Sequence, residues 1–170
     1  MKKRFVVALS FMLFSFAVSA QKYAIIDTKY ILNKMPDYSA AEKRLEQLSL
    51  QWQAELDTLQ AKLDRMYKNY DAEQYMLSDD LKKKREDELF NKEKELRDLQ
   101  KKRFGYEGDL FRERQKLVKP IQDKVYNAVQ KLAIGRGYDF ILDKSEGITV
   151  IFADPKLDKS EDILRELGIK

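Results

Sequence analysis

Residues 38–70 read YSAAEKRLEQLSLQWQAELDTLQAKLDRMYKNY, and their apolar side chains recur at alternating steps of three and four residues. This spacing places them on one stripe of a helix whose other face stays charged, which is typical of a coiled coil. One additional step of four, from Trp52 to Leu56, is a stutter that locally unwinds the supercoil. The stripe, here called the seam, therefore predicts a partner helix. Its positions are Tyr38, Ala41, Leu45, Leu48, Trp52, Leu56, Leu59, Leu63, Met66 and Tyr70.

The partner is predicted to follow a turn at residues 71–77. Ser78 is a suitable N-cap, and the two aspartates after it favour the positive end of the helix dipole. The pattern continues to Ile134, where Gly135-Arg136-Gly137 provides a C-terminal stop. We therefore expect two antiparallel helices that form a long hairpin arm over residues 38–115.

Two features interrupt this second helix. Gly105 and Gly108 each cost about 1 kcal/mol relative to alanine in a helix, so they indicate either a flexible region or a site of close helix packing. Pro120 removes one backbone hydrogen bond and predicts a kink. We expect the arm to join the remainder of the chain near this proline.

Short elements flank the arm on both sides. Tyr23–Asp27 is predicted as a strand, and Thr28–Met35 as a brief helix ended by Pro36. The sequence Ser39-Ala40-Ala41-Glu42 fits a capping box at the start of the long helix. After the arm, residues 138–143 and 148–152 predict two strands around a turn at 144–147, and Ser160 predicts the cap of a last helix that carries Ile163, Leu164 and Leu167.

Three short strands provide too little apolar surface for an independent domain, and open sheet edges invite pairing. We therefore predict a mainly α protein with a small β body, from which a coiled-coil hairpin arm projects, and an oligomer formed by that body. The body would comprise residues 21–37 and 116–170. The residues expected to contact other chains are Ile25, Phe140, Leu142, Val150 and Phe152.

The first twenty residues are typical of a signal peptide. Met1-Lys2-Lys3-Arg4 is basic, residues 5–17 are almost wholly apolar, and Val18-Ser19-Ala20 ends in small residues. The apolar run is too short to span a bilayer easily, although a membrane anchor is the alternative interpretation. We expect export, cleavage after Ala20, and a mature chain that begins at Gln21.

Composition argues against catalysis. The sequence contains no cysteine and no histidine, which removes the usual nucleophile, proton shuttle and metal ligand. It also lacks a phosphate-binding loop, so no cofactor is expected.

The charge of the chain is unevenly distributed. Without the three basic residues near the N-terminus, 30 basic residues stand against 29 acidic ones, but residues 81–137 carry a net charge of +7. The positive charge is thus concentrated on the second helix.

Three surfaces are candidates for binding. An apolar cluster is predicted at the end of the arm, and adaptable Met and Tyr side chains suit varied contacts. An aromatic row at seven-residue spacing on the second helix either widens the hairpin interface or faces a bound protein. A basic stripe either binds or is simply a solvated face. The candidate binding residues are Tyr67, Tyr70, Tyr75, Met76, Leu77, Phe90, Phe104, Phe111, Lys82, Lys83, Lys84, Arg85, Lys101, Lys102 and Arg103.

The order of these elements resembles the Skp/OmpH family of periplasmic chaperones over the whole mature chain. The segments that carry the resemblance are Tyr23–Asp27, the short helix ended near Pro36 and Tyr38, the charged hairpin, Tyr138–Asp143, Ile148–Phe152 and Asp158–Leu164. The resemblance implies a homotrimer with a strand-built body, whose three arms enclose a cavity for unfolded outer-membrane β-barrel proteins.

The function that we predict is an ATP-independent holdase of the periplasm, and not an enzyme. Unfolded outer-membrane proteins would be its partners, with anionic lipid surfaces as a further expected contact. Two other classes remain open: a structural coiled-coil protein of the envelope, and a basic nucleic-acid-binding protein. Export and the near-neutral mature charge disfavour nucleic acid as a partner.

Overall fold

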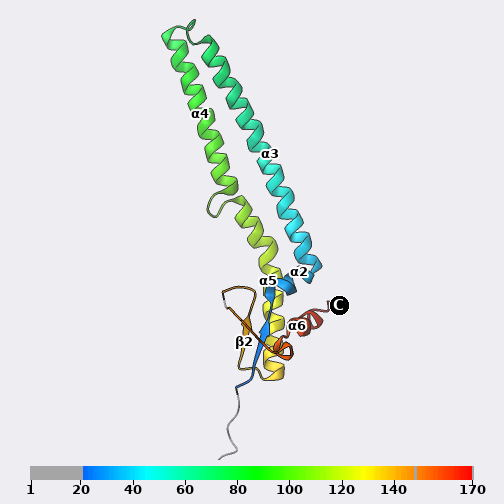
Figure 1. Cartoon of the computed structure of the whole chain (residues 1–170). Coiled ribbons are helices and arrows are strands. Elements are labelled where there is room, and N and C mark those ends of the chain that lie inside the picture. Colours follow the sequence, from blue (N-terminus) through cyan, green and yellow to red (C-terminus); the bar gives the residue numbers. More distant parts are fainter. Residues whose placement is uncertain (1–20, 148, 170) are drawn as a thin grey trace, which may run out of the picture. The chain divides into compact units, whose positions relative to one another are not determined.

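The seam lies on one unbroken helix, α3, which runs from Pro36 to Glu73 (Figure 1). Ala41, Leu45, Leu56 and Leu63 are buried, and the other seam residues are half-buried. The prediction of a helix with a single apolar stripe is confirmed. Its start was predicted wrongly, because Pro36 begins the helix directly after Met35, and Ser39 lies inside the first turns and not in a capping box. Proline suits a first helical position, since its missing N–H would be unpaired there in any case.

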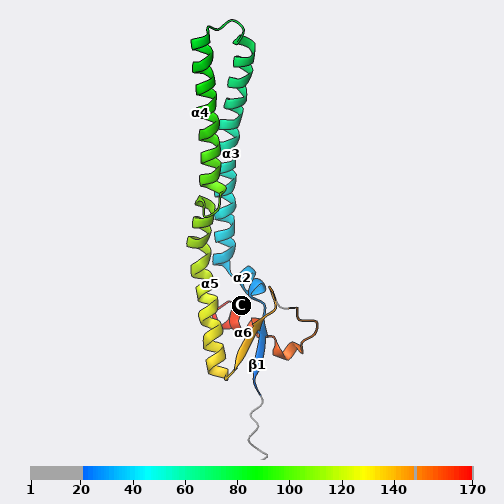
Figure 2. The same ribbon diagram turned by 90° about the vertical axis from the view of Figure 1, so that its left-hand side faces the viewer.

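The partner of α3 consists of two helices. Residues 74–78 connect α3 to α4, Asp79–Phe104, which runs antiparallel beside it (Figure 2). Ser78 is the N-cap by position, although its side chain makes no capping hydrogen bond. Helix α5, Asp109–Arg136, continues in the same direction and passes through Pro120 without a break. The second helix, predicted to run to Ile134 with an interruption at Gly105 and Gly108, is therefore divided into two helices at residues 105–108.

The computed structural model describes residues 21–147 and 149–169. The chain divides into two units. The hairpin unit is Leu32–Val125, and the strand unit is Met1–Ile31 together with Tyr126–Lys170. The predicted signal peptide lies outside the described residues.

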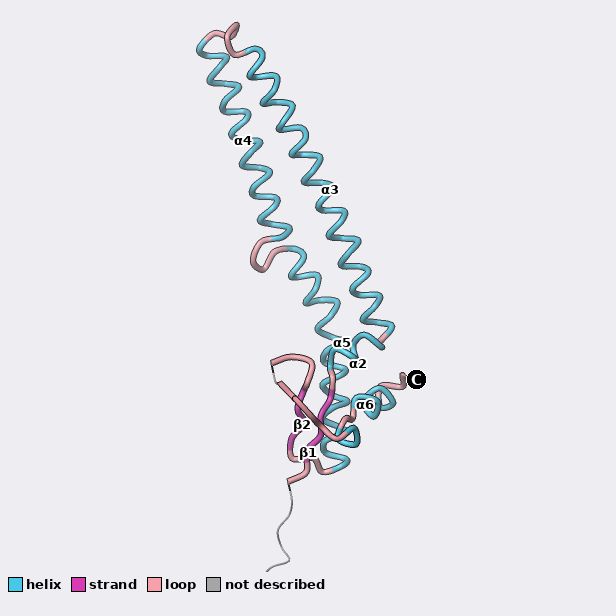
Figure 3. The backbone as a smooth tube through the Cα atoms, viewed as in Figure 1, coloured by secondary structure: helices cyan, strands magenta, loops and turns pink. Residues whose placement is uncertain are grey.

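Figure 3 shows a loop between α4 and α5 that leaves the line of the helices. The N–H of Gly105 donates to the carbonyl of Lys101 (2.8 Å), and the N–H of Gly108 donates to that of Gly105 (2.9 Å). A Cβ atom on Gly105 would lie 2.3 Å from the Lys101 carbonyl oxygen, so the turn requires glycine there. Glu107 adopts a positive φ of 53°, which costs a non-glycine residue of order 1 kcal/mol.

Replacing Gly105 with alanine is expected to destabilise the hairpin unit by about 1–3 kcal/mol, because the Lys101 carbonyl must move. Gly135→Ala is the matched control, since a Cβ at Gly135 meets nothing within 4 Å inside α5. That change should be neutral or stabilise by about 0.5–1 kcal/mol. Urea denaturation followed by circular dichroism measures both. Equal stability of the two variants would show that the loop tolerates a side chain.

The strand unit is built around β1, Tyr23–Ile26, which pairs in parallel with β2, Phe140–Asp143. A parallel pair needs a long crossover connection, and here the connection contains the whole helical hairpin. On its other edge, Ile25 bridges to Asp158, and the N–H of Lys159 donates to the Ile25 carbonyl (2.8 Å). Both edges of β1 are thus paired. The remaining elements are α2 (Thr28–Lys34), the short 3-10 helix η2 (Pro155–Leu157) and α6 (Ser160–Glu166).

The core of the strand unit joins distant segments. Ile31 of α2 and Ile163 of α6 are fully buried, and the last three residues of β1 are buried with Ala128 and Leu132 of α5. Helix α5 ends as predicted, because Gly137 adopts a φ of 63°. The N–H of Tyr138 bonds to Ala133 (2.9 Å), as in a Schellman cap.

Two predictions for the strand unit are wrong. Residues 149–152 form no strand, although the chain bends at residues 144–147, where a turn was predicted; Ile148 lies outside the described residues. Ser160 is not the N-cap of α6, whose first residue it is. Its buried hydroxyl donates to Asp158 (2.6 Å) and accepts the N–H of Asp27 (2.9 Å). This hydroxyl therefore ties α6 to the end of β1.

Asp143 ties the end of β2 to the start of α2. The Thr28 hydroxyl (2.5 Å) and the N–H groups of Thr28 (3.2 Å) and Ser145 (2.9 Å) donate to its carboxylate. Partial burial raises the pKa of Asp143, but these hydrogen bonds outweigh burial and hold the pKa below its ordinary value. The carboxylate is therefore ionised at neutral pH and closes the turn that leaves the sheet.

Candidate functional site

The connection between α3 and α4 exposes a cluster of large apolar side chains. Tyr75 is 88% exposed and Met76 is 81% exposed, while Leu77 is half-buried. Tyr67 and Leu81, on the adjacent helix ends, are also exposed. Such a cluster on the surface of a protein commonly marks a contact site. This end of the hairpin therefore exposes large apolar side chains, which stay candidates for binding.

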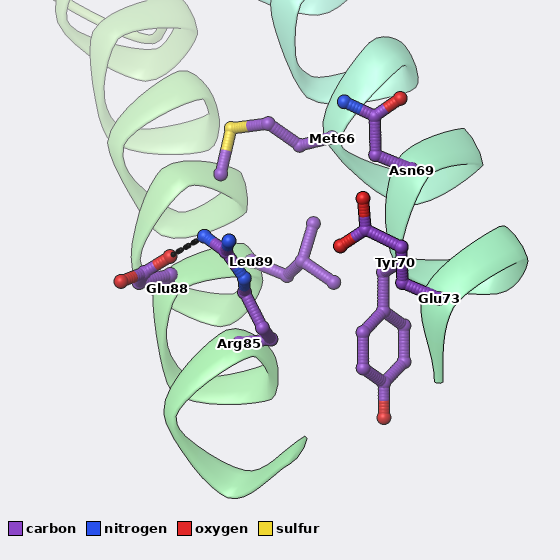
Figure 4. A pocket seen from close by; sticks show the side chains of 7 residues that line it. All are labelled: Met66, Asn69, Tyr70, Glu73, Arg85, Glu88 and Leu89. Atoms are coloured by element: carbon purple, nitrogen blue, oxygen red, sulfur yellow. Dashed lines mark hydrogen bonds and ion pairs between the residues drawn. The ribbon is translucent and has the colours of Figure 1, made fainter. Parts of the chain in front are cut away.

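A cleft of about 100 Å³ lies beside this connection, between α3 and α4. Leu89 points across from α4 toward Tyr70 of α3, and Arg85 pairs with Glu88 at its edge (3.0 Å; Figure 4). The Tyr70 hydroxyl donates to Glu86 (2.5 Å), and this hydrogen bond raises the pKa of Tyr70. The Tyr70 side chain therefore stabilises the contact between α3 and α4. The lining residues are Met66, Asn69, Tyr70, Glu73, Arg85, Glu88 and Leu89.

The aromatic row of the second helix is divided between two roles. Phe104 is half-buried, and its ring packs edge-on against Trp52 of the seam, with centroids 6.4 Å apart. Phe90 remains 60% exposed and Phe111 remains 46% exposed. The neighbouring Leu89 is buried at 5% exposure and fills the interface with α3 in place of Phe90. Phe104 thus belongs to the hairpin interface, whereas Phe90 and Phe111 remain available.

Arg103 is engaged inside the hairpin and is not a free surface charge. Its guanidinium donates to Glu55 (3.1 Å) and to Asp109 (2.8 Å) and lies 4.9 Å from the centre of the Trp52 ring. Partial burial lowers the pKa of Arg103, but the hydrogen bonds to Asp109 and Glu55 outweigh burial and raise it above the ordinary value. The sequence signal for this role is that Arg103 occupies a position where leucine stands one heptad before and one heptad after it.

The remaining basic residues differ in how far they are neutralised. Arg112 pairs with Asp109 (2.5 Å), and Arg114 pairs with Glu42 on α3 (3.1 Å). By contrast, several lysines of α4 make no ion pair with any described residue and, except for the half-buried Lys82, are exposed. The available positive charge therefore lies mainly near the two ends of α4, with Lys94 between them. These lysines are Lys82, Lys83, Lys84, Lys94, Lys101 and Lys102.

The residues predicted to join chains are distributed unevenly in the strand unit. Ile25 is 5% exposed and is buried within its own chain. Phe140 stacks on Tyr23 with ring centroids 5.6 Å apart and remains 43% exposed. Leu142 and Val150 are half-buried, and Phe152 is 84% exposed. The greatest apolar exposure is therefore in the segment after β2, where Ile151 is 96% exposed.

A second apolar face of α5 was missed by the sequence interpretation. Tyr126 is 61% exposed and Ile134 is 83% exposed, and Val129 and Ala133 between them are half-buried. Their helical spacing was readable in the sequence. The signal was obscured because the buried face of the same helix, with Val125, Ala128 and Leu132, overlaps it in the sequence.

Among the described residues, no group of three or more His, Cys, Asp or Glu side chains could hold a metal ion. Within the same part of the chain, no helix combines the length and the apolar character needed to cross a membrane.

The sequence matches the family described as outer membrane protein (OmpH-like) over residues 22–167. The chain belongs to the OmpH-like family. Chaperone protein Skp of Yersinia enterocolitica is 29% identical over 161 residues, which are 90% of this chain and 90% of that protein. A crystal structure of an OmpH-like protein from Caulobacter crescentus has a TM-score of 0.70 at 18% identity, over 88% of this chain and 85% of that one. The family resemblance and the mainly α fold with a small sheet are thereby confirmed.

Proposed function

We propose that this OmpH-like protein is an ATP-independent holdase chaperone that binds unfolded outer-membrane β-barrel proteins and prevents their aggregation. A chaperone role is supported by the family and by the relative from Yersinia enterocolitica, which is named a chaperone. OmpH-like proteins are chaperones and not enzymes, in agreement with the absence of cysteine and histidine from this chain.

The observation that carries the proposal is apolar surface that the hairpin does not use. Leucines of α4 and Phe104 fill the interface with α3, whereas Phe90 and Phe111 stay exposed. Burying such a ring against an unfolded chain is worth about 1.5–3 kcal/mol. Several contacts of this kind can hold a chain without selecting a sequence, and each can be exchanged separately.

The unpaired lysines of α4 extend this surface. Unpaired lysines attract acidic segments of a client and anionic lipid headgroups over a distance of about 10 Å at moderate salt. The sequence has no phosphate-binding loop, so release would follow from folding or transfer of the client. Binding would weaken as salt concentration rises.

The functional form in this proposal is a trimer located in the periplasm. Its support in the strand unit is the exposed apolar surface of Ile151, Phe152, Tyr126 and Ile134. In the described part of the chain, β2 pairs only with β1, so its other edge is open to a strand from another chain. Export, with cleavage after Ala20, is supported by the sequence pattern of residues 1–20.

Changing Phe90 and Phe111 together to serine is expected to reduce aggregation suppression while the melting temperature stays within a few degrees. Both rings are exposed, so little hairpin packing is lost. The assay dilutes a urea-unfolded outer-membrane barrel protein into buffer without ATP and follows light scattering.

Phe104→Ser is the reciprocal control. It removes the contact with Trp52 and should lower the melting temperature by several degrees, since burial of a large aromatic side chain is lost. A stable Phe90/Phe111 variant with undiminished holding would remove these rings from the binding surface. Failure of the wild-type protein to suppress scattering would favour the structural coiled-coil alternative.

A further inference from the structure

The interruption of the second helix at residues 105–108 lies beside the stutter of α3. The stutter runs from Trp52 to Leu56, and the contacts of Arg103 go to Trp52 and to Glu55 within it. On the other side of the loop, the same guanidinium reaches Asp109, the first residue of α5. From α4, one side chain therefore contacts both α3 and α5, at the point where the coiled-coil repeat is irregular on both sides of the hairpin.

This junction is built from partly buried charges. The Arg103 side chain is 22% exposed and that of Asp109 is 18% exposed, while Glu55 is 43% exposed. Arg112 completes the junction, because it donates to Asp109 (2.5 Å) and to the carbonyl of Glu107 in the loop (2.7 Å). A partly buried ion pair with several hydrogen bonds is stronger and less screened by salt than an exposed pair.

The alternative at this position would be leucine, as at the heptad positions on either side of Arg103. Leucine would fill the interface with α3 but could not reach across the loop. The α-helical ladder of hydrogen bonds is interrupted there, and the backbone joins α4 to α5 through turn hydrogen bonds such as that from Gly108 to Gly105. A long side chain with a forked, planar head can bond to α3 and to α5 at once.

We propose that Arg103 is a clip that spans the break between α4 and α5 and fixes both helices to the stutter of α3. The clip converts a loop that would act as a hinge into a stiff joint. Loss of the clip frees the loop and its flanking turns to open locally while the remainder of the seam stays packed.

Hydrogen exchange of the full chain, measured by mass spectrometry, tests this proposal. In Arg103→Gln, we expect exchange over residues 101–112 to rise by about tenfold, as when charge-assisted hydrogen bonds are lost. Exchange over residues 83–96 and 140–166 should stay as in the wild-type protein. Arg97→Gln is the matched control, because Arg97 lies on the same helix and pairs only locally with Glu93 (3.2 Å) among the described residues.

A second variant keeps the test decisive if Arg103→Gln fails to fold. Asp109→Asn removes the negative charge of the anchor on α5 but keeps the contacts of Arg103 with α3, so it should give a smaller rise confined to the same residues. Equal exchange in Arg103→Gln and Arg97→Gln would overturn the proposal. A uniform rise along α3 and α4 would also overturn it, since Arg103 would then be an ordinary interface residue.

Discussion

The double variant Ile151→Asp with Phe152→Asp is expected to lose its oligomer and to sediment with the mass of a single chain. In the isolated chain the two side chains are 96% and 84% exposed, so aspartate there faces water and costs the strand unit little. In an oligomer the same positions would lie between chains. Burying an unpaired carboxylate costs several kcal/mol even after relaxation, which is enough to dissociate an assembly.

Analytical ultracentrifugation and light scattering measure the mass, and circular dichroism checks that the helices remain. Tyr106→Asp is the control, because Tyr106 is 97% exposed but lies in the loop of the hairpin unit. Its mass should equal that of the wild-type protein. If the double variant also kept the wild-type mass, the segment after β2 would not be part of the interface between chains.

The same segment shows why local sequence patterns mislead about strands. Residues 149–152 consist of β-branched residues and one phenylalanine, which predicts a strand, yet in the described part of the chain no segment pairs with them. A strand needs a neighbour to bond with, whereas a helix satisfies its own backbone. The sequence therefore identifies a segment with a tendency to pair, and the partner must be found elsewhere.

The long helices were more predictable because their signal is repeated. Ten seam positions on α3 agree on one face, and errors are confined to its ends, where Pro36 rather than Ser39 begins the helix. The break at Gly105 was indicated by two glycines, but its conformation depends on a single carbonyl of the preceding turn. Composition can locate such a site without giving its geometry.

The candidate site was predictable as a set of residues but not in its division of roles. The sequence groups Phe90, Phe104 and Phe111 in one row, and only the position of Trp52 on the facing helix separates Phe104 from the other two. Likewise, Arg103 stands in a basic run with Lys101 and Lys102, yet it contacts Glu55 and Trp52 from a distant part of the sequence, and Asp109 across the loop. Contacts across a hairpin depend on register, and register is not a local property.

Leu63→Ala is expected to destabilise the hairpin unit by about 2–5 kcal/mol, the usual cost of a cavity in a packed interface. Leu63 is 5% exposed, and its loss leaves a gap facing α4 that the flanking seam residues cannot close without shifting the helices. Leu50→Ala is the matched control, because it is the same substitution in the same helix at a side chain that is 65% exposed. Alanine is at least as good a helix former as leucine, so this control should change stability by less than about 0.5 kcal/mol.

Urea denaturation followed by far-UV circular dichroism measures the free energy of unfolding of both variants. Equal stability of the two would mean that the stripe of apolar residues from 38 to 70 does not carry the packing of the hairpin. A large loss for Leu63→Ala alone would locate the stability of the hairpin in the seam, leaving the exposed rings of α4 and α5 free to bind without a role in folding.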